Sequence, residues 1–146
     1  MAIQRMDNVG IVVDDMEAAK AFFIELGLEL EGTAPIEGPW VDRILGLPDV
    51  RTDIAMLRTP DGHSRLELTT FHNPPPLTPV PSPPPPHTLG FCRLMFAVDD
   101  IKDTVARLHT HDGELLGEIT QFEEAYLLCY LRGPGGVIIA LAEALG

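Results

Sequence analysis

The sequence predicts an α+β fold built from two β-α-β-β-β modules, and three observations lead to this prediction. The segment NVGIVVDDM at residues 8–16 is echoed by RLMFAVDDI at residues 93–101. In both copies an alternating apolar run precedes two Asp residues and a helical pattern. Each copy later ends in two strand-like runs joined by a Leu-Arg-x-Pro-x-Gly turn, at residues 57–62 and 131–136. An internal repeat of this kind indicates two like halves.

The first module begins with a strand and a helix. Alternating apolar positions predict a strand at residues 9–13. Asp14 stands three residues before Glu17, a carboxylate version of the capping box, so a helix is expected to begin here. Gly27 is expected to end it. Apolar residues recur at helical spacing in between, at Met16, Ala19, Phe23 and Leu26.

The second module follows the same order. An alternating run at residues 94–98 predicts a strand, and Asp99 and Asp100 predict the start of a helix. Gly113 is expected to end that helix region. The apolar side of the helix is predicted to carry Ile101, Val105 and Leu108. Both modules are therefore predicted to run strand, helix and further strands.

A proline-rich segment separates the two modules. Nine of the fourteen prolines lie between Pro74 and Pro86. Such a run cannot pair inside a sheet and favours extended polyproline II. We therefore expect a first module at residues 1–73, a linker at 74–87 and a second module at 88–146. The linker's reach would permit halves to pair between chains, and docking of a proline-binding partner is an alternative.

The composition limits the possible partners. Ten basic and 22 acidic residues give a net charge of −12, which repels nucleic-acid phosphates and anionic lipid surfaces. No apolar run is long enough to span a bilayer, and the first residues lack a secretory pattern, so a cytoplasmic protein is expected. Cys92 and Cys129 each lie in an apolar run and are expected to be buried free thiols. The five histidines are expected in solvated loops.

The repeat, the two Val-Asp-Asp helix starts and the segment RTPDGHSRLEL resemble the vicinal oxygen chelate superfamily. Its members include glyoxalase I, methylmalonyl-CoA epimerase, extradiol dioxygenases, and fosfomycin and bleomycin resistance proteins. The resemblance extends from about Arg5 to Glu143. It implies that the two modules form a cup-shaped mixed sheet with helices on the outside, around a divalent metal. It also implies a homodimer.

In this superfamily the metal ligands, typically His and Glu, come from the first and last strands of each module. The matching positions hold Asn8 in NVGI, Glu67 in RLEL, Arg93 in RLMF and Ala140 in IIALAE. One Glu and one Asn do not supply the converging ligands that such a metal needs, and the permanent charge of Arg93 would repel it. We therefore predict no metal ligands and no cofactor.

Glu67 and Arg93 admit three interpretations if they converge as the resemblance implies. They form a structural ion pair where the metal would otherwise bind. Alternatively, they form a polar floor on which Arg93 recognises a ligand's carboxylate, phosphate or carbonyl. In the third interpretation Glu67 abstracts a proton next to a carbonyl while Arg93 or Asn8 stabilises the enolate.

The segment GPWVDRILGLPDVR at residues 38–51 is expected near the mouth of the pocket. Trp40 and Ile44 are at helical spacing, so the segment is either a short helix that packs Trp40 into the protein or a lid with Trp40 and Arg43 over a ligand. The expected apolar cup is lined by Met56, Met95, Tyr130 and Ile138, with Asn8, Glu67 and Arg93 as its polar features.

The predicted function is the binding of a small organic molecule by a glyoxalase/bleomycin-resistance-like protein without the usual metal centre. The alternative is a lyase, isomerase or epimerase that acts beside a carbonyl, similar to lactoylglutathione lyase or methylmalonyl-CoA epimerase. An extradiol dioxygenase is disfavoured, since its iron needs a His/His/carboxylate set. A third hypothesis is a non-catalytic subunit that binds another protein.

Overall fold

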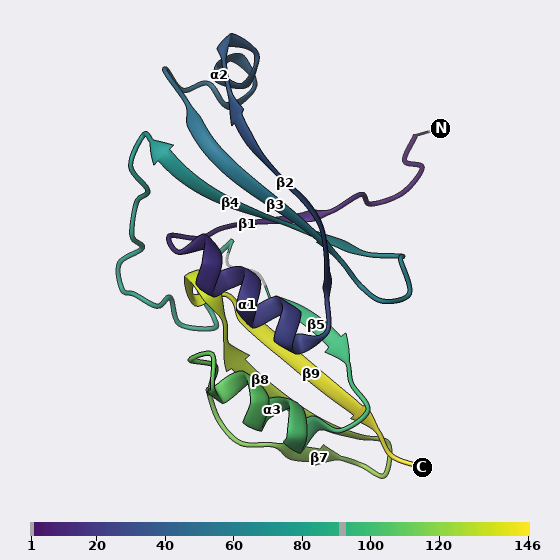
Figure 1. Cartoon of the computed structure of the whole chain (residues 1–146). Helices are drawn as coiled ribbons and strands as arrows, with labels where there is room; N and C mark the ends of the chain where they lie inside the picture. Colours follow the sequence, from purple (N-terminus) through teal and green to yellow (C-terminus); the bar gives the residue numbers. More distant parts are fainter. Residues whose placement is uncertain (1, 91–92) are drawn as a thin grey trace. The chain divides into compact units, whose positions relative to one another are not determined.

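The structure of the chain is a computed structural model that describes residues 2–90 and 93–146. The chain divides into two compact units, residues 1–77 and 78–146 (Figure 1). Each unit contains one mixed β-sheet and few helices, so the predicted α+β fold of two like modules is confirmed. Cys92 lies outside the described residues. Within the described ranges, no helix has the length and apolar character needed to cross a membrane.

The first unit contains four strands and two helices. Its sheet has the strand order β1-β4-β3-β2, in which β1 runs parallel to β4 and the other neighbours are antiparallel. The elements are β1 Val9–Val12, α1 Met16–Leu26, β2 Glu29–Glu37, α2 Pro39–Leu45, β3 Arg51–Arg58 and β4 Arg65–Asn73.

Helix α1 begins and ends at residues whose chemistry suits these positions. The Asp15 side chain caps the helix by accepting a hydrogen bond from the amide of Ala18 at 3.0 Å. The expectation that Asp14 opens the helix was therefore wrong by one residue. Gly27 ends the helix as predicted, because its φ of 125° suits glycine and its amide reaches the carbonyls of Phe23 and Ile24.

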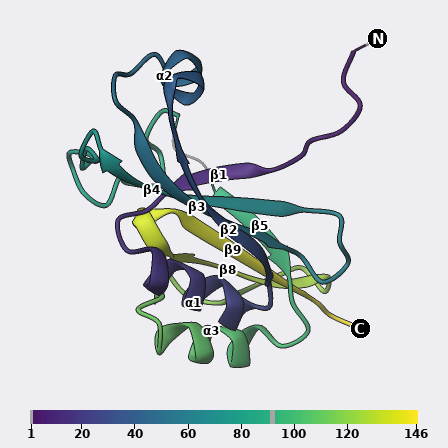
Figure 2. The ribbon, with the colours of Figure 1, turned by 45° about the horizontal axis from the view of Figure 1, so that its top comes forward.

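The sheet of the first unit has one covered face and one open face. Helix α1 lies against the covered face (Figures 1 and 2). Phe22 and Phe23 of this helix are buried, as are Leu57, Leu66 and Leu68 of the sheet. Because side chains alternate along a strand, the residues between these leucines point to the opposite face. That open face carries the site described below.

The second unit repeats this plan. Its sheet has the order β5-β9-β8-β6, with β7 also paired to β8, and β5 runs parallel to β9. The Asp100 side chain caps α3 by accepting from the amide of Asp103 at 3.0 Å, and Glu143 on β9 accepts from the amide of Ile101 at 2.8 Å. The elements are β5 Arg93–Ala97, α3 Ile101–His109, β6 Glu114–Leu115, β7 Thr120–Phe122, β8 Tyr126–Arg132, a 3₁₀ turn Pro134–Gly136 and β9 Ile138–Ala144.

Part of the proline-rich segment packs on the second unit. Pro84 is buried, and a side chain built at Gly136 would lie only 3.1 Å from the Cβ of Pro83. Gly136 has a φ of 80°, so glycine is favoured there both by backbone conformation and by the lack of space. The second Leu-Arg-x-Pro-x-Gly turn thus provides the surface against which these prolines lie.

The thiol of Cys129 on β8 is buried, as expected, and should resist alkylation. Its exposed fraction is 3%, and burial raises the pKa of the thiol to about 11. At pH 8 the thiolate fraction should be about 100-fold below that of an unperturbed thiol. Iodoacetamide labelling of the native protein, followed at the Cys129 peptide by mass spectrometry, should therefore be slower by at least this factor. Labelling at the rate of an exposed thiol would contradict the prediction.

The same pKa shift predicts how stability changes at alkaline pH. The thiol of the unfolded chain, with a pKa near 9.0, ionises before the folded one, so the unfolded state binds fewer protons in this range. The contribution of Cys129 to stability is therefore complete below about pH 9 and is lost as the pH rises toward about 11.

Candidate ligand-binding site

A pocket of about 470 Å³ lies on the open face of the first unit's sheet. All four strands contribute to its floor, and helix α2 forms one wall. Its lining is mainly apolar and consists of Gly10, Ile11, Val12, Ile36, Trp40, Val41, Ile44, Leu45, Thr52, Ile54, Glu67, Thr69 and Phe71.

Helix α2 is short and is fixed at both ends by its sequence. Pro39 occupies the first turn, where a missing amide costs nothing, and Gly46 ends the helix in the left-handed region at a φ of 68°. Val41 is buried and anchors the helix, whereas Trp40 is 51% exposed and Ile44 is 72% exposed. Trp40 therefore forms part of a half-open wall and is not packed fully into the protein.

Among the described residues, Glu67 is the one ionisable side chain that lines this pocket. It lies on β4, opposite Gly10 of β1 and Met56 of β3, and is half-buried. The hydroxyl of Thr69 donates a long hydrogen bond of 3.4 Å to its carboxylate. The other hydroxyl in the lining, that of Thr52, is already committed to the carbonyl of Ile36 at 2.9 Å. Within residues 2–77 no ion pair neutralises Glu67.

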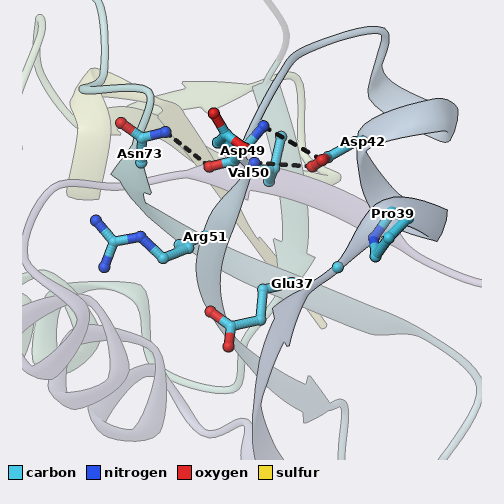
Figure 3. A pocket seen from close by; sticks show the side chains of 8 residues that line it. Glu37, Pro39, Asp42, Asp49, Val50, Arg51 and Asn73 are labelled. Atoms are coloured by element: carbon cyan, nitrogen blue, oxygen red, sulfur yellow. Dashed lines mark hydrogen bonds between the residues drawn. The ribbon is translucent and has the colours of Figure 1, made fainter.

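A second, polar cavity of about 580 Å³ lies on the other side of α2 (Figure 3). The carboxylate of Asp42 accepts hydrogen bonds from the amides of Val50 at 2.8 Å and Asp49 at 3.2 Å. The side chain of Asn73 donates to the carbonyl of Asp49 at 2.7 Å. Figure 3 shows these bonds joining α2 to the start of β3 and the end of β4. Because the side chains of Asp42 and Asn73 are committed to these backbone partners, we assign them a structural role and interpret the apolar pocket as the candidate ligand site.

The second unit places other candidate residues on one face of its sheet. Arg93 pairs in register with Ile138 and lies with its guanidinium carbon 5.3 Å from the ring centre of Tyr130, a cation–π contact. Met95 is exposed and pairs with Ala140, which is fully buried. The guanidinium of Arg93 therefore rests on an aromatic ring.

Comparisons with known proteins agree with this repeated architecture. The family model of the Glyoxalase/Bleomycin resistance protein/Dioxygenase superfamily matches residues 5–141. The chain belongs to this superfamily. A glyoxalase family protein from Bacillus cereus shares 49% sequence identity with the chain over 100% of this chain and 97% of that one, with a TM-score of 0.94.

Solved structures of lower sequence identity share the fold. An antibiotic-binding protein from a Streptomyces species is 20% identical, with a TM-score of 0.62 over 99% of this chain and 98% of that one. The trypanothione-dependent glyoxalase I of Leishmania major is 19% identical, with a TM-score of 0.66 over 97% of this chain and 87% of that one. No protein of curated function matches the chain.

The superfamily implies a divalent metal, but the residues at the four matching positions do not fit one. The strand registers place Glu67 opposite Gly10, and Ala140 opposite Met95, so Glu67 and Ala140 occupy equivalent positions in the two modules. Ala140 offers a buried methyl group, and Arg93 adds a permanent cation. Among the described residues, no group of three His, Cys, Asp or Glu side chains is placed to hold a metal.

The structure brings together some of the predicted site residues. Trp40 and Glu67 line the same pocket, and Met56 is the neighbour of Glu67 across β3 and β4. Asn8 is exposed just before β1, and Arg43 is exposed on α2 without lining the pocket. The residues predicted from the second module are Arg93, Met95, Tyr130 and Ile138, and they share one sheet face there.

Most of the lining residues were not among the site residues predicted from the sequence, and three of them show why. Phe71 continues the alternation that places Glu67 and Thr69 on one face of β4, so this signal could have found it. Thr52 and Ile54 join the site through the register of β3 with β4, which pairs Ile54 with Thr69. That register runs without a shift from Arg58 opposite Arg65, next to the hairpin turn, to Thr52 opposite Phe71.

Proposed function

We propose that this member of the superfamily binds a small organic molecule in the pocket between α2 and the open face of the first sheet, without a metal. The observation that supports this proposal is the lining itself, in which apolar side chains surround one carboxylate and few other polar groups. Pockets for small molecules commonly combine apolar walls with a few polar groups that fix the ligand's orientation. The antibiotic-binding protein of the same fold gives a precedent for a binding role.

Ligand screening should use the only tryptophan of the chain as a reporter. Trp40 lies in the pocket wall, so binding should change its fluorescence in a saturable way and raise the midpoint of thermal unfolding. A ligand at 100 times its Kd should stabilise the protein by about 2.7 kcal/mol. If no compound of a broad panel gives both signals, the proposed function is wrong.

A matched pair of variants tests whether the ligand binds in this pocket. Val12, which lines the pocket, and Ile24, on α1 outside it, are similarly exposed at 53% and 48%. Val12→Arg should weaken binding at least about tenfold, because its guanidinium would occupy the pocket and pair with Glu67. Ile24→Arg adds the same charge and should leave the affinity unchanged. Equal effects of the two variants would place the ligand elsewhere.

A second candidate function is an enzyme that acts beside a carbonyl, as a lyase, isomerase or epimerase. The observation that favours it is the half-buried carboxylate of Glu67, which faces an apolar pocket and has no cationic partner within residues 2–77. Such a carboxylate could accept a proton from a carbon next to a carbonyl. Any ligand found by screening should be incubated with the protein and analysed for conversion. Dimerisation and cytoplasmic location stay predictions.

A further inference from the structure

We propose that the ligand of this pocket carries a positively charged nitrogen, an ammonium or a guanidinium, on an apolar body, and that Glu67 binds this cation. The inference rests on the proposed function and specifies its ligand class. It differs from the sequence-based hypothesis of an anionic ligand held by arginines. Three features of the first unit lead to it.

The first feature is that no Lys or Arg side chain among residues 2–77 pairs with Glu67. The alternation along β4 puts Arg65 on the same face, two residues away, where it could neutralise Glu67. Instead, Arg65 binds Glu31 of β2, with Nε 2.7 Å from Oε1 and a second contact of 3.4 Å. This guanidinium holds the pKa of Glu31 below its ordinary value, so the pair is ionised at neutral pH.

The other cations of the first unit are also placed away from the pocket. Neither Arg43 nor Arg51 lines it, although both belong to segments that border it. The remaining three are engaged in ion pairs, Arg5 with Asp7, Lys20 with Glu17, and Arg58 with Glu29. An anionic ligand would therefore meet a carboxylate and no basic side chain of this unit.

The second feature is the cost of covering Glu67. A ligand that fills the pocket removes water from a carboxylate whose one hydrogen bond within residues 2–77 is the long one from Thr69. Removing water from an unpaired charge is strongly unfavourable, and the cost is offset only by an opposite charge or by strong donors. A ligand ammonium or guanidinium supplies both, whereas a carboxylate or phosphate would add repulsion.

The third feature is the polarity along the pocket floor. Glu67, Thr69 and Phe71 follow one another on the same face of β4, so Phe71 lies about 13 Å from Glu67 at the spacing of a strand. Phe71 pairs with Thr52, and Thr52 pairs with Ile36. Ile36 lies near the end of β2, shortly before α2 begins. The pocket therefore has a carboxylate at one end and an apolar end beneath α2, which matches an elongated molecule with a cationic head.

The test compares three probes with the same body, octylammonium, 1-octanol and octanoate, below their aggregation concentrations. Their affinities are measured by Trp40 fluorescence and checked by calorimetry. Octylammonium should bind at least about tenfold more tightly than octanol, and octanoate should bind most weakly. If octanoate binds as tightly as octylammonium to the natural chain, the inference is wrong. If no probe binds but a compound of the broad panel does, the inference alone is wrong; if neither the probes nor the panel give a ligand, the proposed function is wrong as well.

Two Glu-to-Gln variants then test whether the carboxylate of Glu67 causes the preference for octylammonium. Glu67→Gln should remove the preference for octylammonium, while the affinity for octanol should change by less than about threefold. Glu37→Gln, which removes one negative charge from an exposed position of β2 outside the pocket, should keep the preference. A preference that persists in Glu67→Gln would overturn the inference. The comparison of probes on the natural chain needs no variant and so does not depend on the folding of Glu67→Gln.

Discussion

Truncation of Leu68 to alanine is expected to lower the free energy of unfolding by about 3 kcal/mol, the typical cost of a Leu-to-Ala cavity in a core. Leu68 is fully buried on the covered face of the first sheet. It lies between Ile11 of β1 and Ala55 of β3, its partners in register. The side chain thus contacts two strands, and the small neighbour Ala55 cannot fill the space that it would leave.

Urea denaturation should measure this loss, with Thr70→Val as the matched control. Thr70 follows Leu68 on the same face of β4, and its hydroxyl oxygen is buried without a hydrogen-bond partner among the described residues. Replacing the hydroxyl by a methyl group removes an unsatisfied polar atom at constant volume, so stability should be unchanged or higher by up to about 1 kcal/mol. A Leu68→Ala loss below about 1 kcal/mol would contradict the assignment of this face as the core.

Replacement of Asp42 by alanine should cost about 2 kcal/mol, because the variant leaves the amide of Val50, a part-buried donor, without its acceptor. Asp42 lies on α2 and accepts from two amides at the start of β3, so it fixes the helix to the sheet (Figure 3). We expect amide hydrogen exchange in α2 to become at least about tenfold faster. The amides of α1 should be unaffected.

The Asp42 prediction extends to ligand affinity. Trp40, Ile44 and Leu45 stand on α2 and line the apolar pocket, which Asp42 itself does not line. Loosening α2 should therefore weaken octylammonium binding. Asp42→Asn keeps one acceptor oxygen and should lose less stability, and Arg43→Ala, an exposed neighbour, should stay within about 0.5 kcal/mol of the natural chain. An Asp42→Ala variant as stable as Arg43→Ala would contradict the role of this side chain.

Local chemistry allowed much of the fold to be predicted. The helix starts near Asp15 and Asp100 and the helix end at Gly27 depend on caps that involve residues within a few positions, and such patterns are visible in the chain itself. The strand that carries Glu67 was predicted from the strand-like run that follows the Leu-Arg-x-Pro-x-Gly turn. The position of the first cap was one residue off, because Asp14 and Asp15 are adjacent and only the backbone geometry selects between them.

The candidate site was predicted less completely. Glu67 and Trp40 were expected at the pocket, and the structure puts them in one cavity. Thr52 and Ile54 were not expected there, because they reach the pocket through the pairing of β3 with β4, in which Ile54 lies opposite Thr69. The pairing of Glu67 with Arg93 stays a prediction, since the two residues belong to different units.

By itself, the sequence determined the two modules with their strands, helices and turns, and it showed which residues stand at the four positions that match the superfamily's ligand positions. These features follow from periodicity, capping and residue identity, all of which are local. Only the tertiary structure decided which carboxylate stays without a cation. Arg65 is two residues from Glu67 in the chain but binds Glu31, 34 residues away, because the antiparallel pairing of β2, β3 and β4 brings that side chain within 2.7 Å. Pairing between distant strands therefore decided which charge the pocket presents.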